Sequence, residues 1–135
     1  MTQGRFARVA GYAMSGLVIA FMLLDGVMKL VPMDVVIKST AELGYPPSIA
    51  LARGLGVVGL VCTLLYAVPR TAVLGAILLT AYMGGAVATH VRVGNPLFTH
   101  ILFGVYLAVL LWGGLFLRDP RVRALLPLVS PHDAR

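Results

Sequence analysis

Four long apolar stretches, separated by turn residues, constrain this chain more than any other feature. They cover about residues 9–31, 48–68, 71–91 and 97–117, and each reaches the roughly 20 residues that a helix needs to cross a hydrocarbon layer about 30 Å thick. Hydrophobic residues make up 59% of the 135 residues and charged residues 12%. That leaves too little polar surface to cover a soluble core. The sequence therefore predicts an all-α integral membrane protein with four transmembrane helices.

Short breaks indicate how the later helices are connected. Pro69-Arg70 separates the second and third stretches, and Gly94-Asn95-Pro96 separates the third and fourth. Breaks this short make successive helices antiparallel neighbours. We therefore expect one four-helix transmembrane domain over residues 1–126, followed by a polar C-terminal tail over residues 127–135. The segment from Arg118 onward is polar and contains prolines, so we expect it to be extended or partly disordered at its end.

The first connection is longer and carries helix signals. Pro32 suits the first position of a helix, and Gly44 suits the position just beyond a helix end. Four residues between them have the spacing of roughly one helical face: Val35, Val36, Thr40 and Leu43. This pattern predicts a short interfacial helix in the first, outer loop, where it would cap the bundle.

The distribution of basic residues predicts an orientation. Four spans place both termini on one side, and that side holds most of the arginines: Arg5, Arg8, Arg70, Arg118, Arg121, Arg123 and Arg135. The other side holds Lys38 and Arg92, with Lys29 and Arg53 nearby inside the spans. Because cytoplasmic loops are richer in Lys and Arg, we expect both termini in the cytoplasm. The net charge of +6 then serves topology and contacts with anionic lipids rather than nucleic acid.

Small residues indicate where helices approach one another. Gly11 and Ser15 are four residues apart, as are Ala81 and Gly85. Gly56 and Gly59 thin one side of the second helix, and Gly104 and Ala108 do the same on the fourth. Close packing of small residues drives helix association in lipid. The same faces allow a homo-oligomer, which the sequence does not decide.

Ionisable side chains gather near one end of the predicted bundle. Asp25 and Lys29 are spaced i,i+4 at the end of the first span, so they can pair. Antiparallel threading brings further side chains to the same leaflet: Arg53, Tyr82, His90, Arg92 and His100. We therefore expect these seven residues to form one polar layer near the outer face. The other half of the bundle is nearly free of ionisable groups, which argues against an ion channel or a proton pump.

Two interpretations of this layer compete. It is either a structural ion-pair network that fixes helix registry, or the polar top of a pocket for a quinone-like amphiphile. His90 and His100 also invite a metal or haem interpretation. No carboxylate or cysteine has metal-ligand spacing, so we predict no metal and disfavour haem. Cys62 is the only cysteine and is expected to be a buried apolar residue.

Several short motifs together resemble the DoxX-like family of small four-helix bacterial membrane proteins over roughly residues 10–126. The matching segments are Asp25-Gly26 with Lys29, Leu43-Gly44-Tyr45-Pro46, Pro69-Arg70-Thr71, Gly84-Gly85-Ala86, Thr89-His90-Val91-Arg92, and Trp112-Gly113 through Leu117-Arg118-Asp119. The resemblance implies a bundle in the bacterial inner membrane. It also implies a link to quinone-dependent sulfur oxidation and membrane redox complexes, although this chain lacks a cysteine pair.

Three functions follow as hypotheses. The first is a non-catalytic subunit or a bundle that binds a small lipophilic ligand and serves a membrane redox or stress complex. The second is an enzyme for a lipid-soluble substrate, with His90 or Asp25 as acid/base and Arg53 or Arg92 holding an anionic group. The third is a membrane assembly or chaperone-like factor. An open apolar cavity at the polar layer would favour the first two.

Overall fold

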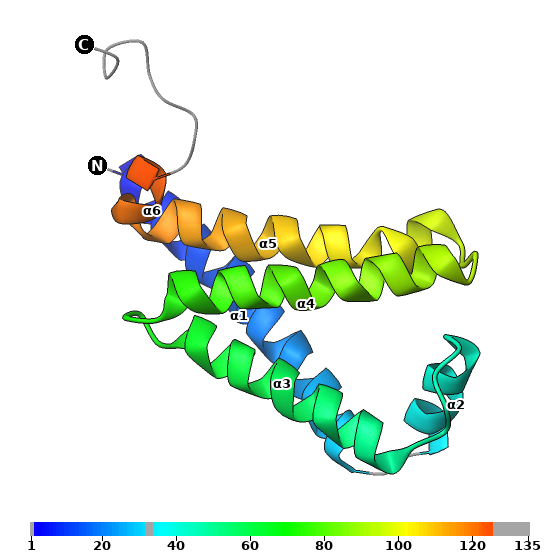
Figure 1. Ribbon diagram of the computed structural model, residues 1–135. Helices are drawn as coiled ribbons and strands as arrows, with labels where there is room; N and C mark the ends of the chain where they lie inside the picture. Colours follow the sequence, from blue (N-terminus) through cyan, green and yellow to red (C-terminus); the bar gives the residue numbers. More distant parts are fainter. Residues whose placement is uncertain (1, 32–33, 126–135) are drawn as a thin grey trace.

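The computed structural model describes residues 2–31 and 34–125, whose regular secondary structure is entirely helical. Figure 1 shows the elements in chain order: α1 (Thr2–Leu30), α2 (Asp34–Glu42), α3 (Ile49–Ala67), α4 (Ala72–Arg92), η1 (Leu97–Ile101), α5 (Phe103–Arg118) and α6 (Pro120–Leu125). Among the described residues, four stretches are long and apolar enough to cross a membrane: Gly4–Leu30, Ile49–Ala67, Ala72–Arg92 and Leu97–Arg118. The predicted all-α, four-helix membrane fold is confirmed.

The fourth span differs from the continuous α-helix that was expected. Its first turn, η1, is π-helical: the Ile101 N–H donates to Pro96 O at 3.2 Å, and the Leu102 N–H donates to Leu97 O at 2.9 Å. These bonds reach five residues back instead of four, which widens one turn before α5 begins. His100 lies in this widened turn.

The two ends of the chain also differ from expectation. Helix α1 begins at Thr2, well before residue 9, because no residue between them breaks a helix. The extended segment predicted after Arg118 is wrong, because α6 forms there. Pro120 occupies the first helical position, and Asp119 Oδ1 accepts the Arg121 N–H at 2.9 Å, which together start a helix. The predicted tail over residues 127–135 lies outside the described residues, as does Pro32.

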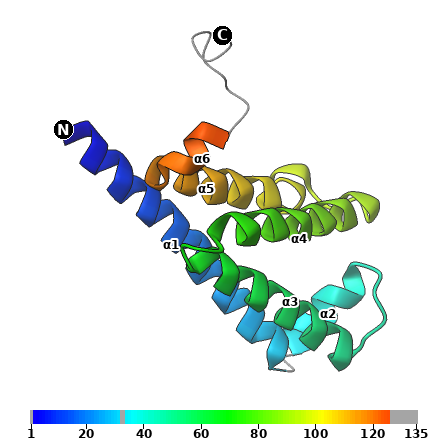
Figure 2. The same cartoon turned by 60° about the vertical axis from the view of Figure 1, so that its left-hand side comes forward.

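The helices form a square in which α1 packs against α3 and α5, and α4 packs against the same two helices. Helices α1 and α4 therefore face each other diagonally. The start of α1, the α3–α4 turn and α6 lie at one end, and α2 and η1 lie at the other (Figure 1). Figure 2 shows that the α1–α3 pair diverges from the α4–α5 pair toward the end that carries α2.

The core is concentrated where the helix pairs converge. Tyr66, Leu79, Leu111 and Leu115 are fully buried there. Helices α1 and α5 are in tight contact at Gly11 and Gly114, and α3 meets α1 at Gly56, where an added Cβ would lie 3.0 Å from Gly26 O. Small residues thus set the helix spacing, as lipid-facing bundles require. Gly84 and Gly85 have no atom within 4 Å of an added Cβ, so this glycine pair is not a packing contact.

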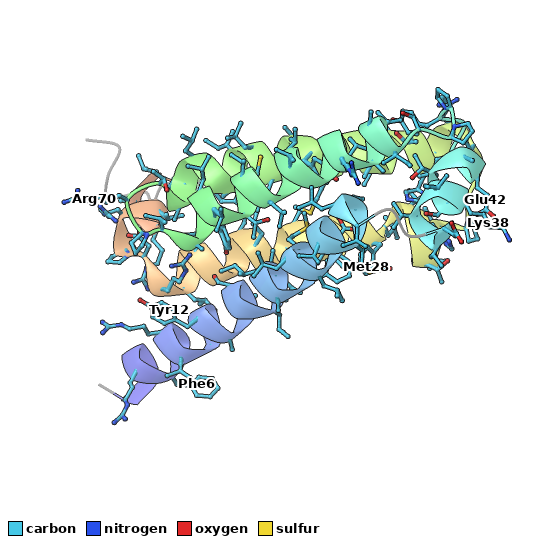
Figure 3. All side chains as sticks on the ribbon, turned by 90° about the horizontal axis from the view of Figure 1, so that it is seen from below. Phe6, Tyr12, Met28, Lys38, Glu42 and Arg70 are labelled. Atoms are coloured by element: carbon cyan, nitrogen blue, oxygen red, sulfur yellow. The ribbon has the colours of Figure 1, made fainter. Side chains whose placement is uncertain are left out.

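Helix α2 confirms the short helix predicted in the first loop. Val36 is buried and Thr40 Oγ1 donates to Val36 O at 2.6 Å, whereas Val35 is 64% exposed and does not share the buried face. Gly44 ends the segment with φ +87°, a conformation that glycine adopts without strain. Figure 3 shows Lys38 and Glu42 on α2 at the end opposite Phe6, Tyr12 and Arg70.

Candidate functional site

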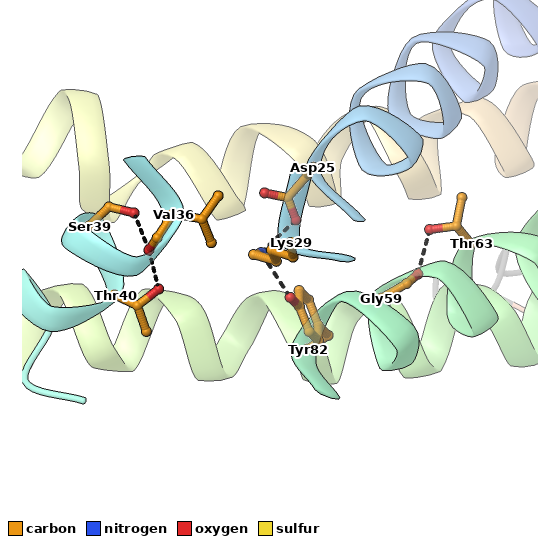
Figure 4. A network of polar contacts seen from close by, with 8 residues as sticks. All are labelled: Asp25, Lys29, Val36, Ser39, Thr40, Gly59, Thr63 and Tyr82. Carbon is orange, nitrogen blue, oxygen red and sulfur yellow. Dashed lines mark hydrogen bonds and ion pairs between the residues drawn. The ribbon is translucent and has the colours of Figure 1, made fainter. Parts of the chain in front are cut away.

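A three-residue cluster spans the diagonal of the bundle in the half that carries α2. Lys29 Nζ donates to Asp25 Oδ2 at 2.6 Å and to Tyr82 Oη at 3.1 Å. Asp25 and Lys29 come from the last turns of α1 and Tyr82 from the middle of α4. Figure 4 shows the lysine between its two partners. We call Asp25, Lys29 and Tyr82 the Lys29 triad.

The sequence positions each member of the triad through helix geometry. The i,i+4 spacing of Asp25 and Lys29 places both side chains on one face of α1, and the ion pair expected from that spacing is present. The Tyr82 ring passes α3 at Gly59, where an added Cβ would lie 3.6 Å from the ring. Thr63 Oγ1 donates a hydrogen bond to Gly59 O at 2.7 Å. A glycine on α3 therefore makes room for the tyrosine to reach across.

The triad has no net charge, but one of its members, Tyr82, keeps a free hydrogen-bond donor. The charges of Asp25 and Lys29 cancel, and their side chains remain 31% and 21% exposed. Tyr82 Oη accepts a hydrogen bond from the Lys29 ammonium, so its own hydroxyl hydrogen is available to another acceptor. The hydrogen bonds among residues 2–31 and 34–125 provide none for it. A phenol that accepts from a cation is a stronger donor than an isolated phenol, which suits it to a carbonyl oxygen.

The two candidate histidines form a separate pair at the α4–α5 turn. Their ring centroids are 5.7 Å apart in an edge-on arrangement. His90 Nδ1 contacts Asn95 Nδ2 at 2.6 Å, and His100 Nδ1 contacts Thr99 Oγ1 at 2.8 Å. Because an amide nitrogen only donates, His90 Nδ1 is the acceptor. Within the described part of the chain, no hydrogen bond or ion pair joins this pair to the Lys29 triad.

The two candidate arginines bind backbone carbonyls. Arg53 Nε donates to Leu30 O at 3.2 Å, and Arg92 Nη2 donates to Leu43 O at 2.6 Å. The first caps the end of α1, and the second ties the loop after α2 to the end of α4. Both contacts satisfy carbonyls that a helix or loop end leaves open. The seven residues expected in one layer are thus divided into a triad, a histidine pair and two carbonyl-binding arginines.

A second polar cluster, which the sequence interpretation missed, lies in the opposite half of the bundle. Ser15 Oγ lies 2.8 Å from Tyr66 Oη, Tyr66 Oη donates to Leu111 O at 2.8 Å, and Arg118 Nε donates to Ser15 Oγ at 3.1 Å. Ser15 and Tyr66 are buried. The expectation that this half is nearly free of ionisable groups is therefore wrong at Arg118, which reaches inward from the end of α5.

The position of each residue along its helix would have revealed this cluster. Tyr66 lies one turn before the α3–α4 break, and Arg118 ends the fourth span. Antiparallel threading brings both to the half of the bundle near the chain ends. Ser15 was interpreted only as a small packing residue, and it does pack, because an added Cβ at Gly114 would contact its hydroxyl.

In the part of the chain that the structure describes, no three His, Cys, Asp or Glu side chains lie close enough together to hold a metal ion. Cys62 is buried in the core and unpaired among these residues, as expected for a small apolar side chain.

Comparison with known proteins identifies the family. No curated protein and no solved structure matches the chain. The model of the DoxX-like family matches residues 13–114, a range that overlaps all four membrane-spanning helices and includes every member of the Lys29 triad. The match covers most of the 135 residues and agrees with the helical membrane fold. The chain therefore belongs to the DoxX-like family.

Proposed function

We propose that this protein binds a small lipophilic carbonyl compound of the quinone class at the Lys29 triad, as a non-catalytic subunit of a membrane redox or stress complex. The observation that carries the proposal is the Tyr82 hydroxyl. It accepts from Lys29 Nζ at 3.1 Å and retains its own proton for a ligand. A quinone oxygen is an acceptor without a donor, so it complements this group.

The surroundings of the triad support a lipophilic ligand. Gly59 lies beside the Tyr82 ring, and the Met22 methyl group lies near the same glycine, so the polar groups stand against apolar surface, as ligand sites commonly do. One turn along the same face of α4, Gly85 has nothing within 4 Å of an added Cβ. The α1–α3 pair also diverges from the α4–α5 pair here (Figure 2). A flat ring stacked near Gly85 would meet no side chain at that glycine.

The charge arrangement favours binding over catalysis. Asp25 is engaged at 2.6 Å by Lys29, which makes it a weak general base. His90 belongs to the separate histidine pair, where Asn95 occupies its Nδ1. The chain has one cysteine and hence no dithiol, so electrons for a bound quinone would come from a partner protein. We therefore prefer a ligand-holding subunit to an enzyme.

We also propose that the bundle lies in the bacterial inner membrane with both termini in the cytoplasm. The support is the excess of arginines at the end that carries Arg5, Arg70 and Arg118, compared with Lys38 and Arg92 at the other end. In this orientation the Lys29 triad lies in the outer leaflet.

Binding of a short-chain benzoquinone tests the proposed function. Native mass spectrometry of the protein in mild detergent would measure the fraction carrying one quinone as its concentration rises. Tyr82→Phe removes the donor and keeps the ring, and we expect about a tenfold weaker affinity, the equivalent of one buried hydrogen bond.

Tyr106→Phe is the matched control. Tyr106 donates to Phe98 O at 3.1 Å in the same half of the bundle. The Tyr106→Phe variant therefore loses a hydroxyl group without changing the triad. Equal affinities for the wild type, Tyr82→Phe and Tyr106→Phe would reject the site, and the absence of any one-to-one quinone adduct would reject the function.

A further inference from the structure

Two cavities adjoin one another at the end of the bundle that carries the termini. One, of about 350 Å³, is lined by Tyr12, Pro69, Ala72, Arg118, Asp119 and Arg121, among others. The other, of about 600 Å³, is lined by Gly4, Arg5, Arg8, Val9 and Tyr12. Tyr12 lines both cavities. Neither cavity borders the Lys29 triad.

Arg118 is held rigidly at the wall of the smaller cavity. Its Nε donates to Ser15 Oγ at 3.1 Å, and its guanidinium carbon lies 5.5 Å from the ring centroids of both Tyr12 and Tyr66. Tyr66 is in turn fixed by its hydrogen bond to Leu111 O. Among the hydrogen bonds of the described residues, none occupies the two terminal amino groups of Arg118. A guanidinium pre-oriented in this way suits a phosphate or carboxylate oxygen.

The charge around the cavities is strongly positive despite one acid. Asp119 is engaged by Arg121, whose Nε and Nη2 donate to its two oxygens at 3.2 Å each. The Arg121 guanidinium holds the pKa of that carboxyl below its ordinary value. Asp119 also attracts Arg118, but it is a single acid among four arginines, so Arg5, Arg8, Arg118, Asp119 and Arg121 together carry a net charge of +3. The cavities together present an anion-binding surface.

The depth of this surface identifies the kind of anion. Arg118 is the last residue of the fourth membrane-spanning stretch, so the smaller cavity opens where the chain leaves the apolar layer. Val9, Pro69 and Ala72 supply apolar walls beside the arginines. A ligand at this depth needs a negative charge at one end and an apolar body at the other. Lipid head groups lie at this level, and basic pockets between membrane helices bind them.

We propose that the surface formed by Arg5, Arg8, Tyr12 and Arg118 is a specific binding site for an anionic phospholipid. Its phosphate is bound by the terminal amino groups of Arg118, and its glycerol and first acyl carbons lie against Val9, Pro69 and Ala72. Tyr12 lines both cavities, and Arg5 and Arg8 in the larger one add electrostatic attraction for the same phosphate. The site is independent of quinone binding at the other end of the bundle.

Native mass spectrometry with defined lipids tests this site. Full-length protein in mild detergent receives phosphatidylglycerol, phosphatidylcholine or inorganic phosphate. We expect a one-to-one adduct with phosphatidylglycerol that phosphatidylcholine does not form and that excess inorganic phosphate does not displace. Arg118→Gln removes the anchored charge and should weaken phosphatidylglycerol binding by about tenfold, as for a lost charge-assisted hydrogen bond.

A second variant guards against misfolding of the first, because Arg118 also holds the buried Ser15. Arg8 is exposed and lines only the larger cavity, so Arg8→Gln should leave the fold intact and weaken lipid binding by about fivefold, the effect of one interfacial charge. Arg123→Gln is the control, since it removes the same charge from exposed α6 without touching either cavity. A melting curve of each variant checks folding.

Three results would overturn the proposal. Phosphatidylcholine binding as tightly as phosphatidylglycerol would show a non-specific lipid contact. Displacement by inorganic phosphate would show that free phosphate is the occupant. Equal binding by the Arg8→Gln and Arg123→Gln variants would show that overall charge, rather than this surface, holds the lipid.

Discussion

Replacing Gly11 by alanine tests whether the α1–α5 crossing depends on backbone contact. An added Cβ at Gly11 would lie 2.8 Å from Gly114 O and 3.0 Å from the Arg118 backbone nitrogen. Both are main-chain atoms of α5, so no side chain can rotate to relieve the contact. The helices must separate by several tenths of an ångström.

The size of the effect follows from two opposing contributions. Overpacking at a rigid contact destabilises by about 1–3 kcal/mol. Alanine also stabilises a helix interior relative to glycine, by about 0.5–1 kcal/mol. Gly16 lies in the same helix with nothing within 4 Å of an added Cβ, so Gly16→Ala receives the helix contribution alone. The difference between the two variants isolates the steric contribution, which we expect to be about 1–3 kcal/mol.

Unfolding in mixed micelles measures this difference. Far-ultraviolet circular dichroism would follow each variant as the fraction of denaturing detergent rises, and the two midpoints would give the difference in unfolding free energy. We expect Gly11→Ala to be less stable than Gly16→Ala. If the midpoints coincide, the close crossing at Gly11 and Gly114 is not what holds α1 against α5.

Two further predictions concern charged pairs. Asp25→Ala should lower the melting temperature clearly more than Lys38→Ala. The first change leaves the part-buried Lys29 ammonium without its partner at 2.6 Å, whereas Lys38 is exposed. Equal melting temperatures for the two variants would contradict a stabilising triad. The second prediction concerns Asp119, whose pKa is lowered by the hydrogen bond from Arg121. Its stabilising contribution is therefore fully present above the ordinary aspartate pKa and is lost as pH falls through the lowered value. The difference in melting temperature between wild type and Asp119→Asn should be small and constant at neutral pH, should begin to shrink as pH falls below about 4, and should vanish only below the lowered pKa. A difference that persists at still lower pH would contradict the assignment.

The membrane fold could be predicted because length, hydropathy and turn residues are properties of the sequence alone. Because the Pro69-Arg70 break is so short, the two helices that flank it must form a hairpin. Gly44 marks the end of α2 because glycine readily adopts the positive φ found there. The π-helical turn of η1 could not be predicted from the sequence, because a run of apolar residues does not indicate which carbonyl each backbone N–H will bind. Hydropathy gives the span, while hydrogen-bond register depends on packing.

The depth of the candidate site residues in the membrane could be predicted from the sequence, but the directions of their side chains could not. Counting residues along antiparallel helices places Lys29 and His90 toward the same end, yet it does not say how each helix is rotated about its axis. Because α1 and α4 are diagonal, only a long side chain such as Lys29 meets Tyr82, while His90 turns to His100. The Ser15 cluster was missed because a hydroxyl in an apolar stretch carries no charge to mark it.

The hydrogen bond between Arg118 and Ser15 has a consequence for biosynthesis. The two residues are 103 positions apart, so at typical elongation rates about 5–20 s of translation separates their appearance from the ribosome. During that interval the buried serine hydroxyl of α1 lacks its arginine, and the face of Gly11 lacks the helix that covers it. The first helix to enter the bilayer is thus completed by the last, and a chain released before α5 would expose a polar, glycine-lined groove to lipid or to a membrane chaperone.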